Sequence, residues 1–130
     1  MRVLRAVAVA VLLDTLVQAA LAGLFVTGDL DLLTWHAANA SVLSALTVAA
    51  LVVWRRLAAP GWPAAAGAVL VALVSVQQGL GEARVLAGHM PLGMAVFGCA
   101  TALAYWAFTH RTGAAGQAGQ PVTGVAGVTE

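Results

Sequence analysis

Residues 6–26 read AVAVAVLLDTLVQAALAGLFV, an apolar run whose only ionisable side chain is Asp14. The run has about the 20 residues that an α-helix needs to cross the hydrocarbon core of a bilayer. Three more apolar runs of similar length follow, at Leu33–Trp54, Pro63–Leu80 and Pro91–Phe108. Because no water satisfies backbone groups at that depth, each run is predicted to form a helix.

The composition agrees with a membrane protein. Hydrophobic residues make up 62% of the 130 positions and charged residues only 8%, too few to cover a water-soluble core with a polar surface. The lipid bilayer is therefore the expected partner. The net charge of +1 offers no basic field, so no nucleic-acid partner is expected. Cys99 is the only cysteine, which excludes an internal disulfide.

The segments between the runs are short and rich in turn-forming or charged residues. Short connections place successive helices antiparallel, so the predicted fold is an all-α, antiparallel four-helix membrane bundle over residues 1–111. The glycine-rich segment 112–130 has too little apolar surface to order itself, and we expect a disordered cytoplasmic tail.

Arginines indicate the orientation. Arg2 and Arg5 precede the first run, Arg55 and Arg56 follow the second, and Arg111 follows the fourth, all on one side of a four-span topology. Both termini are therefore expected in the cytoplasm, in a multi-pass protein of the inner membrane. The chain has no lysine and no isoleucine, as is typical of GC-rich bacterial genomes.

A secretory signal is the competing interpretation of the N-terminus, because Ala20-Leu21-Ala22 fits a small-x-small cleavage pattern. The apolar run continues to Val26 and contains Asp14, and neither feature suits a short signal core. A first transmembrane helix is the favoured interpretation.

Two histidines stand at equivalent places in the two halves of the chain. Gln18 lies in the first run and His36 at the start of the second; Gln78 lies in the third run and His89 at the start of the fourth. Both histidines are expected at the outer face. The pattern is consistent with a duplicated two-helix hairpin, although His36 follows Gln18 by 18 residues and His89 follows Gln78 by 11.

Haem iron binds imidazole, and four-helix bundles build such sites from facing helices. His36 and His89 are therefore candidate axial ligands of a b-type haem, with iron as the metal and with Gln18 and Gln78 as supporting polar residues. In the alternative interpretation, both histidines lie at the membrane boundary and bond to loop backbone or headgroups, with no cofactor. Zinc is a third option that lacks the usual number of ligands.

Asp14 lies near the middle of its predicted helix, where a charged carboxylate is costly. One interpretation is a proton relay or a partner for a cofactor. The other, which the sequence favours, is a neutral acid hydrogen-bonded to Gln18 or to one of the polar residues of the third run, Ser75, Gln77 and Gln78.

The segments that carry a resemblance are Gln18 to Gly23, His36, Gln78-Gly79-Leu80-Gly81 and His89-Met90-Pro91-Leu92-Gly93. They resemble small four-span bacterial membrane proteins of an uncharacterised family, and one four-helix half of haem A synthase. The resemblance covers about residues 14–97 and implies haem-ligand roles for His36 and His89. The synthase pattern has a catalytic glutamate in its first outer loop, where this chain has Asp29 and Asp31.

Three functions are therefore open: a haem-binding electron-transfer protein or subunit, a membrane interaction or assembly protein without a cofactor, and a small transporter. No catalytic residues are predicted. Other membrane subunits or further copies of the chain are possible partners.

Overall fold

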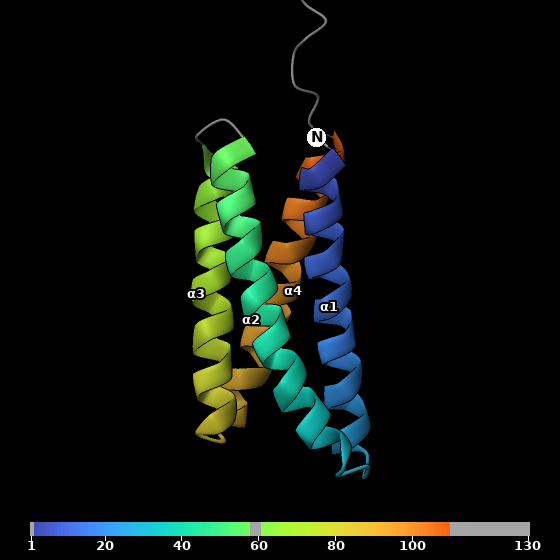
Figure 1. Cartoon of the computed structure of the whole chain (residues 1–130). Coiled ribbons are helices and arrows are strands. Elements are labelled where there is room, and N and C mark those ends of the chain that lie inside the picture. Colours follow the sequence, from blue (N-terminus) through green and yellow to red (C-terminus); the bar gives the residue numbers. More distant parts are fainter. Residues whose placement is uncertain (1, 58–60, 110–130) are drawn as a thin grey trace, which may run out of the picture.

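Four long helices make up the fold. A computed structural model describes residues 2–57 and 61–109, so the predicted tail at 112–130 lies outside the described residues. The helices are α1 (Arg2–Val26), α2 (Leu32–Leu57), α3 (Trp62–Glu82) and α4 (Leu86–Thr109), and all four stand side by side (Figure 1). Each is long and apolar enough to cross a membrane. The predicted all-α bundle of four candidate membrane spans is confirmed.

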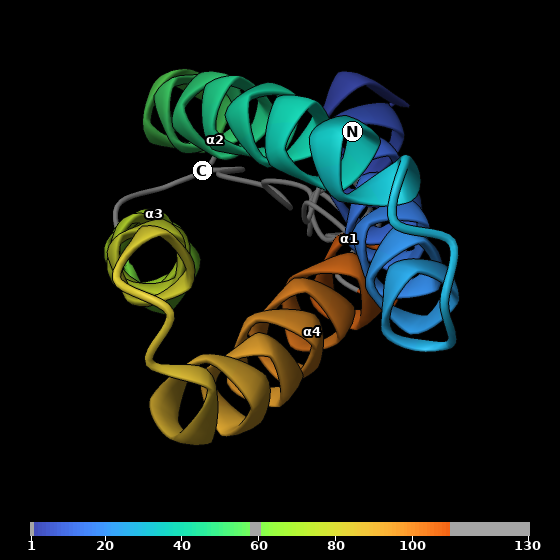
Figure 2. The same ribbon diagram turned by 90° about the horizontal axis from the view of Figure 1, so that it is seen from below.

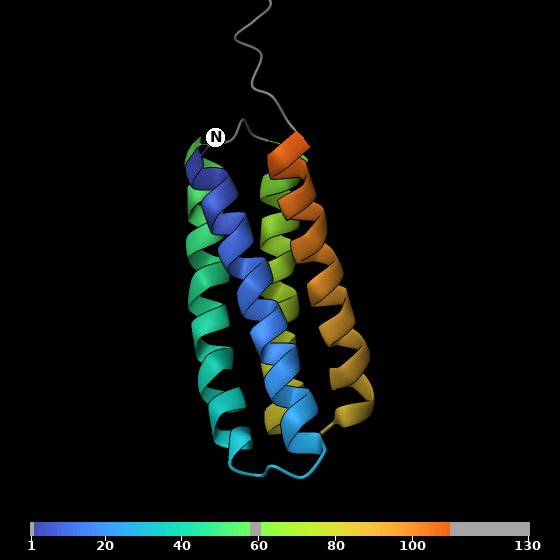
Figure 3. The same ribbon diagram turned by 90° about the vertical axis from the view of Figure 1, so that its right-hand side faces the viewer.

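The helices form a square in which each contacts the two beside it. Contacts join α1 to α2, α2 to α3, α3 to α4 and α4 to α1, whereas the diagonal pairs have no Cα atoms within 8 Å in the described part of the chain. Figure 2 shows this arrangement along the bundle, and Figure 3 shows α1 between α2 and α4. Any side chains that meet across a diagonal therefore meet on the central axis.

Each inner face follows the helical repeat. On α1 the buried residues are Leu4, Ala8, Val11 and Thr15, spaced three or four apart, which places them on one side of the helix. The other helices contribute similar rows, and the largest fully buried side chains include Trp54, Leu4, Leu70 and Leu103. The axis is thus filled by apolar groups over much of its length.

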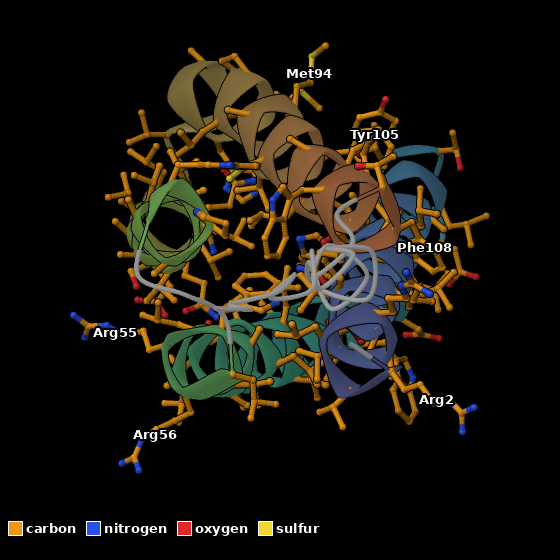
Figure 4. All side chains as sticks on the ribbon, turned by 90° about the horizontal axis from the view of Figure 1, so that it is seen from above. Arg2, Arg55, Arg56, Met94, Tyr105 and Phe108 are labelled. Atoms are coloured by element: carbon orange, nitrogen blue, oxygen red, sulfur yellow. The ribbon has the colours of Figure 1, made fainter. Side chains whose placement is uncertain are left out.

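The outer faces are apolar as well. Large hydrophobic side chains such as Leu13, Val69 and Met94 are exposed, as a surface in contact with lipid requires. Viewed along the bundle, Met94, Tyr105 and Phe108 point away from the axis (Figure 4). Arg2, Arg55 and Arg56 also point outward in this view.

The bundle has two unlike ends. We call the end that carries Arg2, Arg55 and Arg56 the arginine end. The opposite end, formed by the connections 27–31 and 83–85, is the histidine end. At the arginine end, the Arg5 Nε donates to the carbonyl of Ala107 at 3.0 Å, which ties α1 to the last turn of α4.

Three helix boundaries differ by at least three residues from the predicted ranges. The first helix was expected to begin at residue 6, but α1 begins at Arg2. The fourth helix was expected to begin at Pro91, but α4 begins at Leu86 and contains Pro91. A proline lacks the N–H that a helix interior uses, so it suggested a start, yet Pro91 is the sixth residue of α4, where its ring removes the backbone hydrogen bond to the carbonyl of residue 87. Transmembrane helices tolerate such a proline. His89 therefore lies within the first turn of α4. The second helix was expected to end at Trp54, but α2 continues through Arg55 and Arg56 to Leu57. Positive charges in the last turn of a helix interact favourably with the helix dipole.

Candidate cofactor site

His36 and His89 meet on the axis of the bundle at the histidine end. Their ring centroids lie 6.3 Å apart and their planes are inclined by 66°. One ring comes from α2 and the other from α4, which are diagonal helices. The structure thus brings the two predicted ligands together, although 53 positions separate them in the sequence.

Gln18 holds His36 through both its backbone and its side chain. The His36 Nδ1 lies 3.1 Å from the backbone carbonyl of Gln18. The Gln18 Nε2 lies 3.3 Å from the His36 Nε2 and donates to the backbone carbonyl of His36 at 3.1 Å. Asn39 Nδ2 in turn donates to Gln18 Oε1 at 2.9 Å, so the amide of Gln18 is fixed at both ends. Phe25 packs edge-on against the His36 ring, with the centroids 5.2 Å apart.

The second half repeats the arrangement with Gln77. The His89 Nδ1 lies 2.8 Å from the backbone carbonyl of Gln77, and the Gln77 Nε2 lies 3.3 Å from the His89 Nε2. The sequence predicted Gln78 as the partner of His89, but the residue in contact with the ring is the preceding one, Gln77. The inner face of α3 includes Leu70 and Val74 and continues to Gln77, three residues further on, so Gln78 is turned about 100° away from it.

These contacts determine which ring nitrogen carries the proton. A carbonyl only accepts hydrogen bonds, so Nδ1 of each histidine must be the donor. Nε2 then keeps its lone pair and accepts from the glutamine amide. We assign this Nδ1–H tautomer to both rings from the hydrogen-bond pattern. It is the form in which imidazole binds a metal through Nε2 while Nδ1 is held by a carbonyl.

Two glycines make room for the second ring and its partner. A Cβ atom on Gly81 would lie 3.0 Å from the His89 Cε1, and one on Gly93 would lie 3.0 Å from the Gln77 Nε2. Both distances are tighter than ordinary contact. Gly81 and Gly93 thus allow α3 and α4 to hold an imidazole and an amide between them.

One polar atom at the site lacks a partner. The Oε1 of Gln77 is buried and accepts no hydrogen bond within the described residues, whereas the equivalent oxygen of Gln18 accepts from Asn39. A buried acceptor without a partner is uncommon and suggests that a water, an ion or a ligand completes the site.

Asp14 lies on α1, apart from the histidine pair. Its carboxyl group lies beside Asn39 of α2, and its Oδ2 atom is buried with no hydrogen-bond partner in the described part of the chain. The suggested contact with Ser75 is absent there, because Ser75 is exposed and donates to the carbonyl of Val71. Asn39 was not singled out from the sequence, although its position three residues after His36 places it on the same side of α2.

The fold and the site define a class: a bundle of four helices, each long and apolar enough to span a membrane, with two histidines from diagonal helices in contact near one end. Within residues 2–57 and 61–109, no three His, Cys, Asp or Glu side chains gather as metal ligands. Comparisons with protein-family models, curated proteins and solved structures find no match to this chain.

Proposed function

We propose that this protein is a membrane-embedded electron-transfer protein that binds one b-type haem between His36 and His89. The observation that carries the proposal is the 6.3 Å separation of two histidine rings that both keep the Nε2 lone pair. Two metal–imidazole bonds of roughly 2 Å and two ring radii of about 1 Å add to about 6 Å, provided that both Nε2 atoms turn from the glutamine amides toward one iron. At this spacing, the two imidazoles would be close enough to hold one haem iron between them.

The glutamines fit this role. Gln18 and Gln77 hold each ring through Nδ1, which uses a backbone carbonyl and leaves the ring oriented when Nε2 takes another partner. Their side-chain amides lie against Nε2 and would have to turn aside for a metal. Such a turn requires only side-chain rotation. Rotation would also bring the Oε1 of Gln77, which has no hydrogen-bond partner among the described residues, to a position where it could accept a hydrogen bond.

When bound, haem supplies one-electron chemistry at its iron, tuned by its axial ligands and their burial. The protein would supply the two imidazoles, their orientation and a largely apolar surrounding. The bundle axis beyond the histidines is closed by buried apolar residues, including Leu43, Leu70, Val74, Val96, Leu103 and Trp54. Electrons would therefore be exchanged at the histidine end. The same apolar filling disfavours transport, because a transporter needs a polar path through the bundle.

The proposed location follows the arginines. With the arginine end in the cytoplasm, both termini are cytoplasmic and the histidine end faces outward in a bacterial inner membrane. The resemblance to one half of haem A synthase supports the same two ligands. We place any redox partner, whether another membrane subunit or a second copy, at the outward end.

The second candidate is a membrane interaction or assembly protein without a cofactor. One observation favours it: each histidine already forms hydrogen bonds to a glutamine on a neighbouring helix, Gln18 joining α1 to α2 and Gln77 joining α3 to α4. Polar contacts of this kind stabilise helix pairs in membranes.

A spectrum separates the two candidates. The protein is expressed with added haem precursor, purified from membranes and examined by absorption before and after reduction. We expect a Soret band and sharp bands of a low-spin haem on reduction. His36→Ala and His89→Ala should each change or abolish them, whereas His110→Ala, beyond the described residues, should not. A folded, colourless wild-type protein would exclude the haem proposal and leave the second candidate, a membrane interaction or assembly protein, as the function.

A further inference from the structure

Asp14 is an acid without a counter-charge in the middle of the bundle. It lies at the midpoint of α1, about 18 Å from either end of the helix. The helices packed against α1 are α2 and α4. Their charged residues are Arg55 and Arg56, both at the distant arginine end, and α4 has none between Leu86 and Thr109. An ionised Asp14 is thus unpaired within the described bundle.

A chain of polar groups leads from Asp14 to the histidine pair. The Asp14 carboxyl lies beside Asn39, whose Nδ2 donates to Gln18 Oε1 at 2.9 Å. The Gln18 amide is in contact with His36, 3.3 Å from its Nε2 and 3.1 Å from its carbonyl oxygen. His36 lies against His89. The charge state of Asp14 is therefore linked to the histidines through two amides.

Asn39 can serve either form of Asp14. Its amide has two N–H donors and one carbonyl acceptor, and only one donor is used by Gln18. The second N–H can donate to a carboxylate, and the carbonyl can accept from a carboxylic acid. The buried Oδ2 of Asp14 has no hydrogen-bond partner within the described residues, so it is the oxygen free to take a proton.

We propose that Asp14 is a proton-binding site coupled to electron uptake at the histidine pair; this inference rests on the proposed function. One electron would pass from a one-electron donor to the cofactor that His36 and His89 would hold, which is thereby reduced, and one proton from water would bind Asp14 Oδ2. The carboxylate becomes a carboxylic acid, and the net charge inside the bundle does not change. Since charges interact strongly in a low-dielectric interior, the added electron favours the proton and the proton favours the electron.

Few other groups on the elements around Asp14 can take its place. On α2 the titratable side chain nearest in the polar chain is His36, and on α4 the described candidates are His89, Cys99 and Tyr105. Cys99 Sγ donates to Ala66 O on α3, and Tyr105 is exposed on the outer face. The two histidines hold the proposed cofactor, which leaves Asp14 as the proton acceptor.

The test combines redox potentiometry with infrared spectroscopy on the purified full-length protein. In the haem-loaded wild type, the midpoint potential should fall with rising pH, approaching about 59 mV per pH unit, which corresponds to one proton per electron. Asp14→Asn should make the potential nearly independent of pH. The matched control is Asp31→Asn, which removes an exposed acid in the connection between α1 and α2 and should keep the wild-type slope.

Infrared spectra supply a readout that does not need haem. The carbonyl band of a protonated carboxylic acid should appear and disappear as pH is varied in the wild type, and Asp14→Asn should lack it. If the carboxylic-acid band of Asp14 titrates in a protein that binds no haem, the proposed haem-based electron transfer is excluded, while Asp14 is retained as a proton-binding site. The proton-site proposal is overturned if no Asp14 band titrates. It is also overturned if Asp14→Asn keeps the wild-type slope of potential against pH.

Discussion

Replacing Gly81 with alanine should disturb the second histidine without unfolding the bundle. The new Cβ would lie 3.0 Å from the His89 Cε1 and 3.2 Å from its Nδ1, whereas ordinary contact begins near 3.4 Å. The ring must therefore move by a few tenths of an ångström. That shift lengthens the 2.8 Å hydrogen bond from Nδ1 to the carbonyl of Gln77, which fixes the ring.

The size of the effect follows from what is weakened. Losing an outer partner of a metal-binding histidine typically costs 10- to 100-fold in affinity, and here the bond is stretched rather than lost. We expect Gly81→Ala to weaken haem binding about tenfold, or about 1.4 kcal/mol. Alanine favours the helix by roughly 0.5–1 kcal/mol over glycine, so the protein should still fold.

Gly79→Ala is the matched control. Gly79 lies two residues away on the same helix, and a Cβ there would meet nothing within 4 Å. The assay is titration of each purified variant with haem, followed by absorption. Gly79→Ala should bind as the wild type does. Equal haem affinity in the two variants would refute the reasoning, because the crowding of His89 would then have no effect.

Two further substitutions test the packing of the bundle. Gly67→Ala places a Cβ 2.8 Å from Cε3 of the buried Trp54. Such overpacking costs about 1–3 kcal/mol and should lower the thermal unfolding temperature in detergent. Gly98→Ala, whose Cβ would meet nothing within 4 Å, should leave the unfolding temperature unchanged or raise it. The packing account fails if the two variants shift it equally. Arg5→Leu removes the hydrogen bond to the Ala107 carbonyl and should lower the free energy of unfolding by about 1 kcal/mol. Arg5→Lys should recover part of that loss. An Arg5→Leu variant with the wild-type free energy of unfolding would show that this contact contributes nothing.

The fold could be predicted because a membrane allows few solutions. Apolar runs of about 20 residues must become helices, and short connections make them antiparallel. The ends of the helices were harder to predict. Pro91 suggested a start, while the structure begins α4 at Leu86 and includes Pro91, because a transmembrane helix tolerates a proline that removes one of its backbone hydrogen bonds.

The site could be predicted only in part. The sequence predicts that two histidines lie at the same end of two helices. It does not predict that these helices are diagonal neighbours or that the two rings meet on the bundle axis. Gln77 and Gln78 are adjacent, so choosing the partner of His89 requires knowing which side of α3 faces the bundle axis. The buried residues Leu70 and Val74 show that side, and the helical repeat extends it to Gln77. Asn39 could not be ranked from sequence alone, because nothing there shows that it contacts Gln18.

The central claim is that His36 and His89 are the two axial ligands of one haem. The most direct measurement is the absorption spectrum of His89→Ala with and without added imidazole, beside the wild type. The account predicts a low-spin haem spectrum in the wild type, its loss in His89→Ala, and its return when imidazole fills the space left by the side chain. A wild-type protein without a Soret band, or a His89→Ala variant that keeps the wild-type spectrum, would contradict it.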